Sequence, residues 1–316
     1  MDKAASTQKR IEELDFIKCI LILLMISFHL VYINETHPYA KQFVYTFHMP
    51  GFLIISGYLM NTGKQARAFA KSMLAIAIPY MIMESGYIAM ASIFPINEHI
   101  ENLTASVFLN KLFLHPLGPY WYLKTLFICS IIYYIISKFE KLDTISTVII
   151  TGLIFYAIST TKSMSFSNSM YFLAGAAIRR SGKSFLDIFK PSWLAIIALI
   201  LLAANKENLS RATSGGIMIV YLAISFILFI YKVLPDTIKT KAQRLGQKTL
   251  PIFLFSPIFT ILCKLFLPYL MFDPSGMVYL AVSVPLCVVG SLMISKMLHF
   301  CADFTKKTFR NSVNIV

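Results

Sequence analysis

The sequence predicts an all-α protein: a polytopic integral membrane bundle of about ten transmembrane helices, with both termini in the cytoplasm. The first observation behind this prediction is composition, because the 316 residues are 57% hydrophobic and only 14% charged, with a mean hydropathy of +0.68. Soluble domains carry about 25% charged residues. The second is arrangement, since long apolar runs alternate with short polar segments. The third is the distribution of basic residues, which are concentrated in every second polar segment.

The apolar runs define the expected spans, counted on the roughly 20 residues that a helix needs to cross a bilayer. A short outer turn over Asn34 to Phe43 should join the first two. The chain shows no internal repeat, no low-complexity segment and no soluble domain, so we predict one integral membrane domain over residues 1–316. The expected spans run over 14–33, 44–61, 72–94, 119–137, 144–161, 166–180, 191–205, 215–234, 249–270 and 277–299.

Lysine and arginine give the orientation. Most of the 29 basic residues fall in the segments on the same side as the termini, and such an excess marks the cytoplasmic side. Short cytoplasmic loops therefore explain the net charge of +14, and the lipid bilayer, not nucleic acid, is the expected partner. The basic residues expected in outer segments are Lys41, Lys111, Lys162, Lys206, Arg211 and Lys264.

The five cysteines lie in or beside apolar runs without a CxxC pair, which indicates small core residues. We expect neither a disulfide framework nor a metal site. The N-terminus mixes acidic and basic residues, and no small-residue cleavage site follows the first apolar run. That run is predicted to be a retained span and not a signal peptide.

One face of the first span is polar. Asp15, Lys18, Ile22, Met25 and His29 recur at spacings of three and four, so they share a helix face. At 1.5 Å per residue, Lys18 and His29 are about 16 Å apart along the helix axis. A face with an acid, a lysine and a histidine should line a polar interior, and ionisable groups inside a membrane are functional-site hypotheses by default.

Two histidines are candidate catalytic residues. A histidine is well suited to take a proton from a hydroxyl near neutral pH, so His29 could activate an alcohol or assist transfer from a thioester. His48, near the outer start of the second span, is expected at a similar depth and would assist by orienting either His29 or the acceptor. The alternative for each is a packed histidine bonded to a backbone carbonyl. Lys18 either snorkels to the headgroups with Asp15 as its partner, or binds a phosphate.

The second span contains helix breakers. Pro50, Gly51 and Gly57 occur in or beside it, and such residues persist in membranes where they line a cavity or let helices approach closely. Ser56, in the same run, is a candidate substrate contact. Its alternative role is a hydrogen bond to a backbone carbonyl.

Three further residues complete the candidate binding set. Glu84 is expected past the middle of the third span, and Lys124 about a turn and a half into the fourth. Glu84 is either the partner of Lys124 or part of a proton route. Trp121, at the outer interface, belongs to an aromatic belt or stacks on a sugar ring.

Six blocks of sequence carry a resemblance to a known family: LDFIKCILILLMISFH (14–29), FHMPGFLIISGYL (47–59), IPYM (78–81), GPYWYLKTLF (118–127), YFLAGAAIRR (171–180) and LGQKTLPIFLFSP (245–257). They resemble the integral-membrane acyltransferase 3 family, and especially its fucose 4-O-acetylase-like branch. The first two blocks, in this order and close together, are the most specific. The resemblance spans most of the chain.

The resemblance implies an enzyme, an acyltransferase transferring groups other than amino-acyl groups. It would be an O-acetyltransferase that moves an acetyl or other acyl group from acyl-CoA to a sugar hydroxyl. The acceptor would be a cell-surface polysaccharide or its lipid-linked precursor. Acetyl-CoA would be a donor substrate and no cofactor would be bound. The expected location is the bacterial inner membrane, as a multi-pass protein of polysaccharide biosynthesis.

The resemblance also implies residue roles. Family members carry a basic residue, then ten residues, then the histidine held to be catalytic, and here these are Lys18 and His29. Many members have arginine at the first position, whereas lysine offers a point charge without the bidentate fork. Two alternatives stay open: a non-enzymatic exporter of polysaccharide or lipid-linked sugar, and an ion-coupled carrier using Glu84, Lys124 and the histidines.

Overall fold

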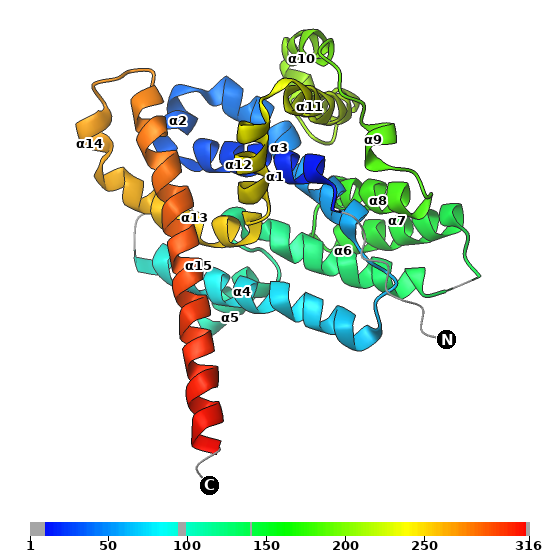
Figure 1. Cartoon of the computed structure of the whole chain (residues 1–316), viewed down its shortest axis with the longest axis horizontal. Helices are drawn as coiled ribbons and strands as arrows, with labels where there is room; N and C mark the ends of the chain where they lie inside the picture. Colours follow the sequence, from blue (N-terminus) through cyan, green and yellow to red (C-terminus); the bar gives the residue numbers. More distant parts are fainter. Residues whose placement is uncertain (1–9, 94–98, 140, 314–316) are drawn as a thin grey trace. The chain divides into compact units, whose positions relative to one another are not determined.

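The computed structural model describes residues 10–93, 99–139 and 141–313, and all the regular elements in these ranges are helices (Figure 1). This confirms the prediction of an all-α protein. Within these described ranges, four helices are long and apolar enough to cross a membrane, or five if a bent pair counts as one span. A polytopic membrane protein is consistent with this set, while the count of ten spans stays a prediction.

The chain forms two compact units, which are described separately. Unit 1 takes in the chain up to Pro38, Pro191–Ile196 and the chain from Ile224 onward. Unit 2 takes in Tyr39–Lys190 and Ile197–Ala223. The single domain expected from the sequence stays a prediction.

Unit 1 is built around its first helix. In Figure 1 this helix is drawn in dark blue, and the long last helix in orange to red. The last helix packs along α13, and α12 and α13 both contact α1. The elements are α1 (Glu12–His29), α2 (Val31–Thr36), the second half of α11 (Ser214–Val233), α12 (Asp236–Gly246), α13 (Thr249–Leu262), η3 (Cys263–Leu265), α14 (Leu267–Leu270) and α15 (Met277–Val313).

Unit 2 holds the middle of the chain. Neighbouring helices pack in chain order, with α4 against α5 and α6, and α7 against both α6 and α8 (Figure 1). The elements are α3 (Pro38–Leu59), α4 (Ala66–Ile93), α5 (Ala105–Phe113), η1 (Gly118–Tyr120), α6 (Trp121–Ser137), α7 (Thr144–Thr160), α8 (Phe166–Arg180), α9 (Phe185–Ile188), most of α10 (Ala195–Ala203), η2 (Lys206–Asn208) and the first half of α11.

Several expected spans fall short of bilayer length. Helices α7, α8 and α10 have 17, 15 and 9 residues, against the roughly 20 that a perpendicular crossing requires. Helix α1 has 18 residues, but four of them are charged: Glu12, Glu13, Asp15 and Lys18. Because its first turns are charged, α1 differs in composition from the helices that have an uninterrupted apolar run.

The connection after the first helix differs from the prediction. The first span was expected to run to residue 33 and a turn to cover residues 34–43. Instead α1 ends at His29, because Leu30 is extended, with φ −71° and ψ 118°. Helix α2 follows at once, and α3 begins at Pro38, a residue whose fixed φ suits the first position of a helix.

The segment before the ninth expected span was also predicted wrongly. Residues 236–246, expected as an inner loop, form α12, with Asp236 in the first turn and Arg244 in the last, as the helix dipole favours. Helix α12 bends by 76° into the next apolar helix. The expected continuous span over 249–270 ends as a regular α-helix at Leu262.

Two glycines bring α3 and α8 into backbone contact. A Cβ at Gly57 would meet the carbonyl oxygen of Phe172, and a Cβ at Gly175 would meet that of Ile54. Small residues at both positions are therefore required for the helices to approach this closely. The predicted role of Gly57 in close helix approach is confirmed.

The cysteines behave largely as expected from their apolar surroundings. Four of them are free and buried: Cys19, Cys129, Cys263 and Cys287. The side chain of Cys301 lies outside the part of the chain that is described. The four described cysteines thus serve as small core residues.

Candidate active site

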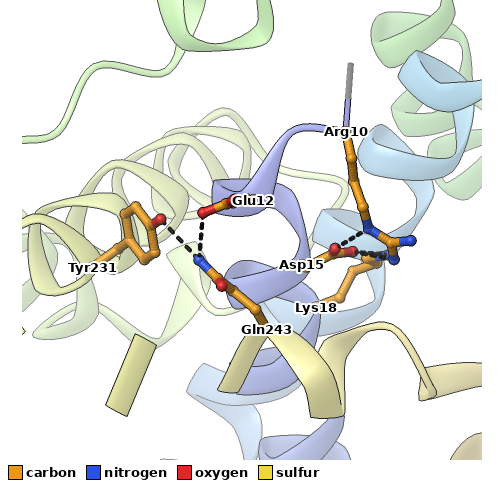
Figure 2. A network of polar contacts seen from close by, with 6 residues as sticks. All are labelled: Arg10, Glu12, Asp15, Lys18, Tyr231 and Gln243. Carbon is orange, nitrogen blue, oxygen red and sulfur yellow. Dashed lines mark hydrogen bonds and ion pairs between the residues drawn. The ribbon is translucent and has the colours of Figure 1, made fainter. Parts of the chain in front are cut away.

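A cluster of three charges opens α1. Oδ1 of Asp15 lies 2.8 Å from Nζ of Lys18, and Oδ2 lies 2.5 Å from Nε of Arg10 (Figure 2). The aspartate side chain is 4% exposed, against 17% for the lysine and 58% for the arginine. The predicted pairing of Asp15 with Lys18 is confirmed. The second cation was missed from the sequence; its hydrogen bond to Asp15 raises the pKa of the guanidinium of Arg10.

Helices α11 and α12 hold this end of α1 in place. The Cα of Gly246 packs so closely that a Cβ would meet the carbonyl oxygen of Asp15. Nε2 of Gln243 donates to Oε2 of Glu12 at 3.1 Å and to the hydroxyl of Tyr231 at 2.9 Å (Figure 2). The charge cluster therefore sits on a helix fixed by two others.

His29 is the last residue of α1. Its Nδ1 lies 2.6 Å from the carbonyl oxygen of Met25, one turn earlier. Because a carbonyl only accepts, the proton of the neutral ring is on Nδ1, and Nε2 carries the lone pair. The carbonyl bond expected of a merely packed histidine is thus present, and the same bond fixes the tautomer that a general base needs.

His48 repeats this arrangement on α3. The side chain is buried, and Nδ1 lies 2.8 Å from the carbonyl oxygen of Val44. The ring of Tyr45 packs beside it, with centroids 5.1 Å apart. His29 and His48 belong to different units, so their matching depth stays a prediction.

The two motif residues of α1 lie on one uninterrupted helix. Helix α1 runs without a break from Glu12 to His29. Lys18 and His29 are therefore about 16 Å apart along its axis, as expected. Any ligand that contacts both residues must have that reach.

Ser56 takes a partner that the sequence did not suggest. Its Oγ lies 2.9 Å from the hydroxyl of Tyr122, which comes from α6. The ring of Phe52 packs against the same tyrosine, with centroids 6.0 Å apart. Ser56 thus joins α3 to the start of α6, where the candidate Trp121 also lies.

Glu84 and Lys124 both hold loop backbone. Oε1 of the fully buried Glu84 accepts the N–H of Leu117 at 2.6 Å. Nζ of Lys124 donates to the carbonyls of Leu114 and Ser163, each at 2.6 Å. The two charges also interact electrostatically, as the predicted partnership requires. Both therefore fix the segment that leads into α6.

A further basic residue, Arg211, lies at the start of α6. The guanidinium of Arg211 lies over the ring of Trp121, 5.3 Å from its centroid, and donates to Oδ1 of Asn168 at 3.3 Å. The hydroxyl of Tyr171 donates to the backbone carbonyl of Arg211 at 2.7 Å. Burial lowers the pKa of this guanidinium. Its place among the few basic residues of the expected outer segments was the signal that could have marked it.

Comparison with known proteins decides the family. The sequence model of the acyltransferase 3 family, described as an acyltransferase domain, matches residues 11–296. The chain belongs to this family. Every candidate residue named above, from Asp15 to Arg211, lies within the residues that this acyltransferase-domain model matches.

A curated relative adds a weaker likeness. The chain is 25% identical over 216 residues to the nodulation protein NolL of Mesorhizobium japonicum. The aligned region covers 63% of this chain and 56% of the relative, so the chain spans little more than half of that protein's length. No solved structure matches the chain. The fucose 4-O-acetylase-like branch stays a prediction.

Proposed function

We propose that the protein is a membrane O-acyltransferase that moves an acetyl group from acetyl-CoA to a sugar hydroxyl. The acceptor is a cell-surface polysaccharide or its lipid-linked precursor. The observation that carries this proposal is the bond from Nδ1 of His29 to the carbonyl of Met25, on the helix that also bears Lys18. It sets Nε2 as the proton acceptor inside a chain that belongs to an acyltransferase family.

The proposed reaction uses His29 twice. Nε2 takes the proton of the sugar hydroxyl while the hydroxyl oxygen attacks the thioester carbonyl carbon. As the tetrahedral intermediate collapses, the carbon–sulfur bond breaks and the acyl group stays on the sugar oxygen. The CoA thiolate leaves and receives the proton from His29. His48 has the same tautomer, and its assisting role stays a prediction from the sequence.

Lys18 is proposed to bind the donor. An ammonium has three N–H donors, and the ion pair with Asp15 uses one of them. The others are suited to a phosphate of acetyl-CoA, and the aspartate holds the ammonium in position. An extended pantetheine arm would cover the distance of about 16 Å to His29.

The remaining candidates are proposed to shape the acceptor site within unit 2. Ser56 and Trp121 are joined through Tyr122, whose ring lies 6.4 Å from that of the tryptophan. Glu84 and Lys124 hold the backbone that leads into this region. The proposal includes the ten-span topology and cytoplasmic termini, which the charge distribution supports. It also includes a location in the bacterial inner membrane, which the family resemblance implies.

The test is release of free CoA thiol from acetyl-CoA by the purified full-length chain, with the glycan fraction of the source cell as acceptor. Wild-type protein should release thiol in an acceptor-dependent manner, and His29→Ala should abolish this release. His115→Ala is the matched control, because His115 is exposed and outside the proposed mechanism. Equal thiol release by wild type and His29→Ala would overturn the proposal. So would absence of release by wild type while surface polysaccharide still depends on the protein, which is the result expected of an exporter.

A further inference from the structure

Three segments far apart in the sequence meet around one guanidinium in unit 2. Arg211 comes from the residues just before α11, Asn168 from the first turn of α8, and Trp121 from the first turn of α6. Lys124, one turn further along α6, donates a hydrogen bond to the carbonyl of Ser163, in the connection between α7 and α8. The guanidinium is therefore held by a fixed framework and not by a single loop.

The contacts of this guanidinium are all to neutral groups. Its N–H acceptor is the amide oxygen of Asn168, and its stacking partner is the indole of Trp121. Among the side chains that the structure describes, in residues 10–93, 99–139, 141–298 and 300, no carboxylate lies within ion-pair distance of Arg211. The charge is half-buried but uncompensated, an arrangement that is costly unless an anion arrives.

We propose that Arg211 binds an oxyanion carried by the acceptor glycan: a carboxylate of an acidic sugar, or a phosphate that links the sugar to its carrier. This inference rests on the proposed function and names the class of its acceptor. Stacking on Trp121 fixes the plane of the guanidinium. The bond to Asn168 uses one of its five N–H donors, so a fork remains for two oxygens.

The expected topology assigns this anion to the acceptor and not to the donor. Arg211 lies in a segment that the distribution of lysine and arginine places outside. The phosphates of CoA belong to a cytoplasmic molecule, and the proposed donor cation, Lys18, is near the inner end of the first span. A planar arginine is also the cation best matched to carboxylate and phosphate geometry.

The chain offers a direct reporter for the test. It has two tryptophans, Trp121 and the exposed Trp193. The full-length variant Trp193→Phe, purified in a neutral detergent, leaves Trp121 as the sole indole, in contact with the guanidinium in question. Its fluorescence is titrated with glucuronate, with glucose 1-phosphate and with neutral glucose, which share a pyranose ring and differ in the anion.

The proposal expects a saturable fluorescence change with glucuronate or glucose 1-phosphate that glucose does not produce. Whichever anion binds more tightly identifies the carboxylate or the phosphate as the group recognised. Arg211→Gln should weaken that binding at least about tenfold, since it removes a charge-assisted pair. Arg211→Lys should weaken it less. Lys206→Gln, an exposed cation of the same segment, is the matched control and should leave it unchanged.

Two results would overturn the proposal. One is an equal response to glucose and to both anions, which needs no variant and so does not depend on whether Arg211→Gln folds. The other is a response only to phosphatidylglycerol added to the detergent, which would assign the guanidinium to a lipid headgroup. His29→Ala separates this inference from the proposed function: the Trp121 titration should stay intact in that variant even if acetyl transfer is lost or was never present.

Discussion

The charge clusters of the two units differ in whether the chain supplies a counter-charge for the buried group. In unit 1 the buried carboxylate of Asp15 is ion-paired with both Arg10 and Lys18, so the chain supplies its own counter-charges. In unit 2 the guanidinium of Arg211 is held by the indole of Trp121 and the amide oxygen of Asn168, which carry no net charge. The first arrangement stabilises the fold and holds a cation in place, whereas the second is completed by a ligand.

The largest effect should follow removal of the shared carboxylate in unit 1. Asp15→Asn keeps the shape of the side chain but leaves the mostly buried Lys18 without its anion. Breaking a buried pair in this way costs about 3 kcal/mol, the lower end of the usual range, because Arg10 is more than half exposed. Thermal unfolding of the purified protein in detergent measures the loss.

Glu12→Gln provides the control for this variant. Glu12 is an exposed carboxylate on the same turn of α1, and glutamine keeps an oxygen that accepts the hydrogen bond from Gln243, so the substitution should change the free energy of unfolding by no more than about 0.5 kcal/mol. Similar losses for the two substitutions would show that the Asp15 cluster contributes nothing special to stability.

Gly246→Ala should give the next largest effect. The added methyl group would strike the backbone carbonyl of Asp15 and force α12 away from α1. Overpacking of this kind costs about 2 kcal/mol. The same loss of position should raise the KM for acetyl-CoA more than it lowers kcat, because Lys18 sits on the displaced turn.

The matched control is Gly86→Ala on α4. A Cβ at Gly86 meets nothing within 4 Å, so this substitution should leave the unfolding midpoint unchanged or raise it. A midpoint for Gly246→Ala at or above that of wild type would contradict the close contact of α12 with α1.

Arg211→Gln should behave differently from Asp15→Asn. Because Arg211 has no anionic partner in the described chain, its loss removes an unfavourable half-buried charge along with the contact to Trp121. The free energy of unfolding of the ligand-free protein should change by less than about 1 kcal/mol. A loss as large as that of Asp15→Asn would make Arg211 a structural cation and remove the contrast between the units.

The smallest effect should come from substitution of Asp273, a carboxylate whose hydrogen-bond donors are all neutral. Hydrogen bonds from the hydroxyl and N–H of Ser275 and the N–H of Val278 lower the pKa of this partly exposed aspartate from its usual 3.8. Since the folded pKa is the lower one, the stabilisation is present above about pH 4 and is lost as the pH falls through the folded value.

Asp273→Asn should therefore have a slightly lower unfolding midpoint than wild type at pH 7, and the two midpoints should converge as the pH falls below about 4. A difference that stays constant down to pH 3 would show that the carboxylate charge is not what the hydrogen bonds stabilise.

Helix face and composition were predictable from the sequence, and the partners across the fold were not. The spacing of Asp15 and Lys18 predicted their pairing, because residues three apart on a helix are neighbours. The glycine at position 57 predicted close helix approach. These are local or compositional signals that survive in any arrangement of the other helices.

The missed features depend on long-range contacts. Gln243 was overlooked because α12 is polar and short, and a polar segment between apolar runs resembles a loop. Arg211 was counted only as a charge, since nothing in the sequence shows that it stacks on Trp121. Glu84 was predicted as a binding residue, and its hydrogen bond to the N–H of Leu117 became visible only with the loop in place.

The most direct measurement is transfer of radiolabelled acetyl from acetyl-CoA into the glycan fraction, comparing wild type, His29→Ala and His115→Ala at matched membrane abundance. Label is expected in the glycan with wild type and His115→Ala, and none with His29→Ala. Undiminished label with His29→Ala would contradict the role given to Nε2 of this histidine. No label with any of the three would contradict acetyl transfer to a glycan itself.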